Sequence, residues 1–125
     1  MILLDTSVLI DHLRDAPGTG AALDAAVERG ELVVASVLSA VELLQGMRTN
    51  ERRRVGELLA ALGWIDVSFD IAERAGEHAR RFRRSHWSIG SVDYVIAATA
   101  EIHGAALWTT NIRHFPMFPK LTPPY

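Results

Sequence analysis

The sequence predicts an α/β fold in which a parallel sheet is packed between helices. Four short apolar runs follow one another along the chain, and amphipathic helical patterns separate them. The runs lack the polar alternation of a strand with one wet face, as is typical of strands buried on both faces. The chain has 125 residues, of which 49% are hydrophobic and 22% charged. This size and balance predict one globular domain over residues 1–125.

Each expected element has a recognisable boundary. The expected strands are residues 2–4, 32–35, 64–67 and 106–109. The expected helices cover residues 8–13, 20–29, 50–63, 70–84 and 91–104, with a further helix from Ser36 or Ser39 through Met47. Asp5, Thr6 or Ser7 can cap the first helix, and Gly30 is a typical C-terminal cap for the second. Four prolines beyond residue 115 predict a mostly irregular tail.

Composition excludes several chemistries. Cysteine is absent, which excludes disulfides, cysteine-ligated zinc, iron–sulfur clusters and a thiol nucleophile. Twelve of the 13 basic residues are arginine, and the single lysine, Lys120, lies in the tail, so Schiff-base and P-loop chemistry are disfavoured. No apolar run approaches the roughly 20 residues that span a bilayer, and the N-terminus lacks the basic segment of a signal peptide. We therefore expect a cytoplasmic protein without a membrane segment.

Three acidic residues are set among apolar neighbours near predicted strand ends. Asp5 follows the first strand, Glu42 lies about two turns into the helix after the second, and Asp93 begins the helix before the fourth. Alone, Asp5 could be a helix cap, and the other two could be solvated helix-face residues. In a parallel α/β sheet, however, these positions face one crevice. Carboxylates gathered there repel each other unless a cation binds, and oxygen ligands favour Mg²⁺ or Mn²⁺, which support phosphodiester hydrolysis.

Four segments carry these acids and other polar residues in a specific order. They are residues 3–7 (Leu-Leu-Asp-Thr-Ser), 39–46 (Ser-Ala-Val-Glu-Leu-Leu-Gln-Gly), 91–100 (Ser-Val-Asp-Tyr-Val-Ile-Ala-Ala-Thr-Ala) and 107–115 (Leu-Trp-Thr-Thr-Asn-Ile-Arg-His-Phe). Each segment is weak alone, but in this order and spacing the chain resembles the PIN-domain ribonucleases, specifically the VapC-type toxins of bacterial toxin–antitoxin pairs. The resemblance implies a PIN-like three-layer sandwich with a central, mostly parallel sheet of four to five strands flanked by helices.

The same resemblance implies an activity, a metal and partners. The protein is expected to be a Mg²⁺- or Mn²⁺-dependent endoribonuclease that inhibits translation and growth, forms a homodimer, and is neutralised by a cognate VapB-type antitoxin. Asp5, Glu42 and Asp93 form the acidic metal site in this reading. The two aspartates are the principal ligands, and Glu42 completes the site or orients the attacking water.

Four further residues match polar positions around that site. Ser7, Thr109 and Asn111 could bond the carboxylates or metal-bound waters, although capping and turn roles also suit these residue types. Many relatives carry a fourth acid where this chain has His114. His114 could replace that acid as a ligand, contact phosphate, or have only a capping or packing role.

The net charge of −2 is unevenly distributed. Residues 1–47 carry −5, residues 48–84 carry +3, and the remainder is neutral. Two arginine runs make the middle segment basic; they are Arg52–Arg54 and the group Arg80, Arg81, Arg83 and Arg84. Both could be solvated and paired locally with glutamates. The second run is the stronger candidate for RNA phosphate contacts, and Trp87 beyond it could stack on a base.

Apolar residues at helical spacing, namely Leu9, Leu13, Val41, Leu44 and Met47, are expected in the core, as are Trp64 and Trp108.

Two other function classes remain open. An aspartyl-phosphate phosphatase would also place a nucleophilic aspartate after the first strand, but it usually has a second aspartate two residues on, where this chain has Ser7, and a supporting lysine. A PIN-like protein without strong catalysis could act as a binding module, and His114 in place of an acid keeps this alternative open. Trapping of an acyl phosphate would identify the first, and absence of RNA cleavage the second.

Overall fold

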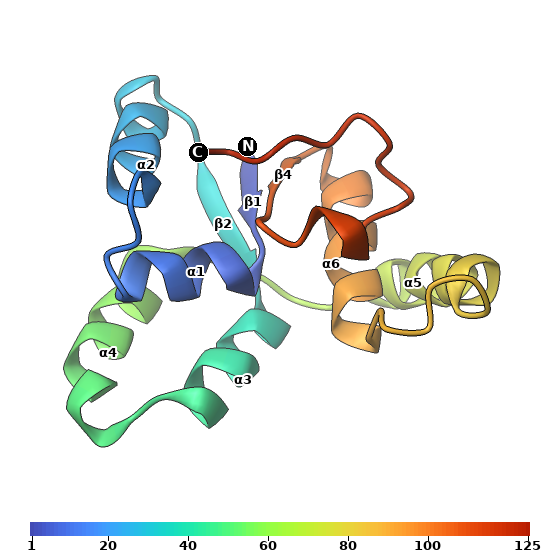
Figure 1. Cartoon of the computed structure of the whole chain (residues 1–125), viewed down its shortest axis with the longest axis horizontal. Coiled ribbons are helices and arrows are strands. Elements are labelled where there is room, and N and C mark those ends of the chain that lie inside the picture. Colours follow the sequence, from blue (N-terminus) through green and yellow to red (C-terminus); the bar gives the residue numbers. More distant parts are fainter.

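A four-stranded parallel sheet in the order β3-β2-β1-β4 forms the centre of the computed structural model, which describes residues 1–125 (Figure 1). The strands are β1 (Ile2–Leu4), β2 (Val33–Ser36), β3 (Gly63–Ile65) and β4 (Ala106–Trp108). The helices are α1 (Thr6–Leu13), α2 (Thr19–Glu28), α3 (Val37–Gly46), α4 (Arg52–Ala61), α5 (Phe69–Phe82) and α6 (Ser91–His103). Two 3₁₀ turns complete the chain, η1 (Thr49–Glu51) and η2 (Ile112–His114). The predicted α/β fold with a parallel sheet and flanking helices is confirmed.

Strand β1 divides the core into two parts because its side chains alternate between the faces of the sheet. Ile2 and Leu4 pack with Val8 and Leu9 in the layer formed by the N-terminal helices. Leu3 points the other way and packs with Ile96 in the layer that contains α6. In Figure 1, α1 to α4 lie on one side of the sheet, and α5 and α6 lie on the other. All three residues of β1 are at most 3% exposed, as the unbroken apolar run predicts.

Several element boundaries differ from the sequence prediction by a few residues. The helix expected over residues 50–63 is divided into the η1 turn and α4. The helix expected over residues 70–84 ends at Phe82, so Arg83 and Arg84 lie in the following turn. Thr109 lies just beyond β4 instead of inside it.

The prediction that the five apolar residues at helical spacing belong to the core is wrong for two of them, and a third, Met47, is half-buried just beyond α3. Leu9 is fully buried, but Val41 is 54% and Leu44 is 48% exposed. Helix α3 buries Ser39 and Leu43 against the sheet layer, and a helix has only one such stripe, so positions off that stripe face solvent. Trp64 and Trp108 are half-buried and pack against the core that contains β1.

Helices α5 and α6 are joined by a polar cluster as well as by apolar contacts. Glu101 of α6 accepts a hydrogen bond from Arg74 of α5 at 2.9 Å and bonds to the buried imidazole of His78. Ile71 and Ala98 pack nearby in the apolar contact between the same two helices. The pairing therefore fixes α5 against α6, whose first turn reaches the carboxyl edge of the sheet (Figure 1).

No helix in the structure combines the length and apolar character needed to cross a membrane.

Candidate active site

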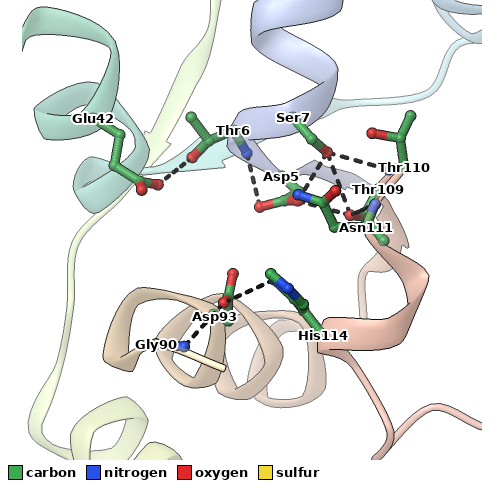
Figure 2. Close-up of polar contacts among 10 residues, drawn as sticks. All are labelled: Asp5, Thr6, Ser7, Glu42, Gly90, Asp93, Thr109, Thr110, Asn111 and His114. Atoms are coloured by element: carbon green, nitrogen blue, oxygen red, sulfur yellow. Dashed lines mark hydrogen bonds and ion pairs between the residues drawn. The ribbon is translucent and has the colours of Figure 1, made fainter. Parts of the chain in front are cut away.

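The three acids expected to gather in one crevice line a single cavity at the carboxyl edge of the sheet. Asp5 follows β1, Glu42 projects from α3, and Asp93 lies in the first turn of α6 (Figure 2). The cavity has a volume of about 370 Å³ and is lined by Asp5, Thr6, Ser7, Ile10, Asp11, Glu42, Asp93, Thr110, Asn111 and His114. Parallel strands bring these helix starts to one edge, so residues far apart in the sequence become neighbours.

One side of the cavity, which we term the β1 wall, is built around Asp5, Ser7 and Thr109. Asp5 is only 3% exposed, and its Oδ1 accepts the Thr6 N–H at 2.9 Å, which caps α1. Its Oδ2 accepts the hydroxyls of Ser7 at 2.9 Å and Thr109 at 2.7 Å. Asp5 is therefore a helix cap and a cavity residue at once, and three donors fix its orientation.

The segment after β4 is tied to this wall by backbone groups. The Thr110 N–H donates to the Ser7 hydroxyl at 3.1 Å, and the Asn111 N–H donates to the Thr109 hydroxyl at 2.9 Å. Asn111 lines the same cavity as Asp5. Ser7, Thr109 and Asn111 thus lie beside the carboxylate that the sequence assigned them to.

Glu42 is held by a residue that the sequence analysis missed. The Thr6 hydroxyl donates to Glu42 Oε1 at 2.6 Å and lies 2.9 Å from the buried Ser39 hydroxyl. A hydroxyl has one proton, so when Thr6 donates to the carboxylate it accepts from Ser39. Thr6 therefore connects α1 to α3 and directs the Glu42 carboxylate. Its place between Asp5 and Ser7 in the first motif was the only sequence signal.

The opposite side of the cavity, which we term the α6 wall, consists of Gly90, Asp93 and His114. Asp93 Oδ2 accepts the Gly90 N–H at 3.2 Å and lies 3.2 Å from His114 Nδ1 (Figure 2). Burial raises the pKa of Asp93 above its ordinary value of 3.8, and the nearby Asp5 and Glu42 carboxylates raise it further. The Gly90 N–H and His114 act in the opposite direction. His114 occupies the position where the family resemblance implies a fourth acid, and its imidazole contacts Asp93.

The donor set of the cavity fits a hard divalent cation. Asp93 Oδ1 and Glu42 Oε2 receive no hydrogen bond from the protein, and Asp5 Oδ1 receives one, which leaves a lone pair. A bound cation would relieve the mutual repulsion that contributes to the raised pKa of Asp93. No group of three or more His, Asp or Glu side chains in the structure is arranged so that it could hold a metal ion by itself. Mg²⁺ usually keeps several waters and is bound through only one or two carboxylates, so its binding does not require such a group.

Asp11 is a further carboxylate on the cavity that the sequence analysis did not select. It accepts a hydrogen bond from the hydroxyl of the C-terminal residue, Tyr125, at 2.7 Å. Burial and this contact raise the pKa of Tyr125 to about 12. Asp11 lies one helical turn after Ser7, so the i,i+4 spacing was a usable signal, whereas nothing local indicated Tyr125.

The two arginine runs occupy different environments, and neither lines the cavity. In the first run, Arg53 pairs with Glu57 at 3.1 Å, and Arg54 pairs with Asp15 at 3.2 Å while donating to the Leu13 carbonyl at 2.6 Å. In the second run, no member forms an ion pair and all four are exposed. The nearby acid Glu77 is instead occupied by Arg74.

The geometry disfavours the phosphatase alternative. Asp5 Oδ2 already accepts two hydrogen bonds, so it is a poor nucleophile. The single lysine, Lys120, lies in an apolar groove of about 540 Å³ between β4 and the tail, away from the acids. This groove is larger than the acidic cavity, but no acidic side chain lines it.

Fold and cavity together are those of a PIN domain, and the chain belongs to the PIN-domain family, whose model matches residues 2–119. Two relatives from Mycobacterium tuberculosis carry the name ribonuclease. Ribonuclease VapC19 is 47% identical over the whole of both chains. Ribonuclease VapC10 is 49% identical over all of this chain and 93% of the relative. The family resemblance inferred from the four sequence motifs is confirmed.

A solved structure supports the same assignment. A chain in a toxin-antitoxin complex from Klebsiella pneumoniae has 27% sequence identity and a TM-score of 0.82. The match covers 100% of this chain and 98% of that chain, so it includes the sheet, both helical layers and the tail.

Proposed function

We propose that the protein is a metal-dependent endoribonuclease, and that it acts as the toxin of a toxin–antitoxin pair. The observation that carries the proposal is the convergence of Asp5, Glu42 and Asp93 on one oxygen-lined cavity. Membership of the PIN-domain family and the names of the two Mycobacterium relatives supply the substrate class, RNA. Cleavage of RNA in the cytoplasm is then expected to inhibit translation and growth.

Asp5 and Asp93 are the principal ligands for Mg²⁺ or Mn²⁺ in this proposal, since they face each other across the cavity (Figure 2). The ion supplies an activated water and neutralises charge on the phosphodiester. Ser7 and Thr109 keep the Asp5 carboxylate in a fixed orientation through their hydrogen bonds to Oδ2. A fixed ligand lowers the reorganisation needed when the substrate arrives.

Glu42 is suited to orient and deprotonate the attacking water. The Thr6 hydroxyl fixes Oε1, and Oε2 has no hydrogen-bond partner in the protein. A carboxylate that is held at one oxygen and free at the other can accept a proton without losing its position. Cleavage then proceeds by in-line attack on phosphorus and breakage of the P–O bond.

His114 supports the site through Asp93. Its Nδ1 faces Asp93 Oδ2, so a protonated imidazole favours the ionised form of the aspartate and can also approach a substrate phosphate. This arrangement provides a role for the residue that stands where many relatives have an acid.

The partner surfaces follow from the charge and the exposed apolar residues. Arg80, Arg81, Arg83 and Arg84 offer unpaired cations to RNA phosphates. Val41 and Leu44 expose apolar area on α3, the helix that carries Glu42. A VapB-type antitoxin that covered this face would also close the cavity, and a second copy of the chain is the further expected partner.

Incubation of purified protein with total RNA, followed by sequencing of the new 5′ ends, tests the proposal. We expect cleavage at defined sites with Mg²⁺ or Mn²⁺, none in EDTA, and restoration when metal is added back. Asp93→Asn is the matched inactive control, since it keeps the size of the side chain. Equal cleavage by the wild type and this variant would contradict the assignment.

A further inference from the structure

The loop between α5 and α6, residues 83–90, presents an indole to solvent. Trp87 is 86% exposed, the highest value among the large hydrophobic side chains that face solvent. A lone exposed apolar residue needs no explanation by itself. Trp87 differs because its flanking residues fix the loop and because the surrounding charge is unusual.

The chain is anchored on both sides of Trp87, at His86 and at Ile89. The His86 N–H donates to the Phe82 carbonyl at 2.8 Å, and its ring packs edge-on against Phe82 with centroids 5.7 Å apart. On the other side, Ile89 is buried against α5 and α6, and its N–H donates to the His86 carbonyl at 3.1 Å. The indole is therefore displayed by a fixed turn, so a ligand that stacks on it orders little additional backbone.

The charge around this turn is positive and uncompensated. Arg80 and Arg81 end α5, and Arg83 and Arg84 begin the loop. None of them forms an ion pair, in contrast to Arg53 and Arg54 of the first run. Exposed guanidinium groups without carboxylate partners, beside an aromatic face, are the combination that binds single-stranded nucleic acid.

The loop also leads directly to the acidic cavity. It ends at Gly90, whose N–H holds Asp93 Oδ2, and the chain runs from the end of α5 back to the start of α6 (Figure 1). Trp87 precedes Gly90 by three residues, so their Cα atoms lie within about 11 Å even in a fully extended chain. At a rise of ~3.4 Å per nucleotide, a stacked strand covers that interval with roughly three nucleotides.

We propose that Trp87 stacks on an unpaired base of the RNA substrate a few nucleotides from the cleaved bond. The four arginines Arg80, Arg81, Arg83 and Arg84 contact the neighbouring phosphates. The inference rests on the proposed ribonuclease function. The ligand is single-stranded RNA, because a base inside an A-form helix is already stacked and the narrow major groove excludes side chains.

Binding measurements with the full chain test this inference. A labelled single-stranded RNA of about 12 nucleotides, within the range of known single-strand sites, is titrated in EDTA so that it stays intact. We expect Trp87→Ala to weaken binding by about 5- to 150-fold, the equivalent of ~1–3 kcal/mol for one stacked base. Trp87→Phe should retain most of the affinity. Phe69→Ala is the matched control, because Phe69 is 78% exposed at the other end of α5 and should have no effect.

Tryptophan fluorescence distinguishes direct contact between RNA and Trp87 from an indirect effect of the substitution on RNA binding. RNA should quench the emission of the wild type but not that of Trp87→Phe, since Trp64 donates its indole N–H to the Leu59 carbonyl and Trp108 is part of β4. Glutamine at the four arginines should lower the salt dependence of binding, whereas Trp87→Ala should leave the slope unchanged. Substitution of Arg52, Arg53 and Arg54 by glutamine should have the smaller effect on RNA affinity.

The outcomes distinguish the two proposals. A wild type that neither binds nor cleaves RNA with Mg²⁺ would overturn the proposed function itself. A wild type that cleaves RNA while Trp87→Ala binds and cleaves equally well would overturn only the stacking contact. Loss of dimer or antitoxin binding in Trp87→Ala, with RNA affinity intact, would assign the indole to a protein interface and overturn this inference as well.

Discussion

The two walls of the acidic cavity are built on different principles. In the β1 wall, Asp5 is almost fully buried, and three donors satisfy it while it also caps α1. In the α6 wall, Asp93 is held by one backbone N–H and one imidazole, and burial together with the opposing acids raises its pKa. Asp5 therefore stabilises the fold as well as lining the candidate site. Asp93 also lines the site, but ionisation of its partly buried carboxyl lowers the stability of the fold. The difference can be measured, because each wall responds in its own way to loss of its carboxylate.

Replacement of each aspartate by alanine should give the largest contrast. Both variants should lose RNA cleavage, because each removes a proposed principal ligand of the metal. Asp5→Ala should also lower the free energy of unfolding by about 2–4 kcal/mol, since it removes a helix cap and leaves buried donors without an acceptor. Asp93→Ala should change stability by about 0.5 kcal/mol or less. Urea unfolding of the two variants gives the comparison, and equal losses of stability would contradict the distinction between the walls.

Substitution of Thr6 tests whether its hydroxyl couples the β1 wall to the function of Glu42. Thr6→Val removes the hydroxyl that joins Glu42 to Ser39 and should reduce the cleavage rate about tenfold, with a loss of roughly 1 kcal/mol of stability. The matched control is Thr110→Val, because the Thr110 hydroxyl has no protein hydrogen-bond partner and only its backbone N–H contacts Ser7. Rates from single-turnover cleavage are compared at saturating metal. An unchanged rate in Thr6→Val would remove Thr6 from the site.

Asp93→Asn tests the electrostatic cost in the α6 wall. The raised pKa means that the native state disfavours the charged form, so the cost is present above the raised pKa and disappears as the pH falls toward 3.8. In EDTA at pH 7, the variant should be more stable than the wild type, and the advantage should vanish near pH 4. Thermal unfolding across this pH range measures it. A constant difference at every pH would show that Asp93 ionisation is not the cause.

His114 should have the smallest effect. Its contact lowers the pKa of Asp93, so His114→Ala should allow that pKa to rise further. In the proposed function Asp93 binds metal as a carboxylate, so the acidic limb of the pH–rate profile should then move to higher pH while the maximal rate falls only a few-fold. A rate that falls equally at every pH would instead indicate direct contact between His114 and substrate.

Much of the fold and part of the site could be predicted from local sequence. Ile2-Leu3-Leu4 without polar alternation predicts a strand buried on both faces, and β1 packs into both core layers. Asp5 directly follows this strand, at a position where a helix cap or a crevice residue is expected. It caps α1 and also lines the cavity. These predictions depend on neighbours within a few residues, so the sequence contains the needed information.

Other features were decided by tertiary structure because they depend on contacts between distant residues. The Thr6–Glu42 and Tyr125–Asp11 hydrogen bonds join positions 36 and 114 residues apart. The exposure of Val41 and Leu44 depends on which stripe of α3 meets the sheet.

The arginine runs illustrate the same limit. They make residues 48–84 basic, although the net charge of the whole chain is −2. Both have glutamates at helical spacing, yet the structure places Asp15 beside Arg54, while Arg74 occupies Glu77 and leaves Arg80 and Arg81 unpaired. The sequence by itself determined which chemistry the chain possesses, namely oxygen ligands, arginine and no thiol. Only the folded chain decided which of those charges meet and which stay free, because Coulomb interactions and hydrogen bonds depend on distances that the order of residues does not fix.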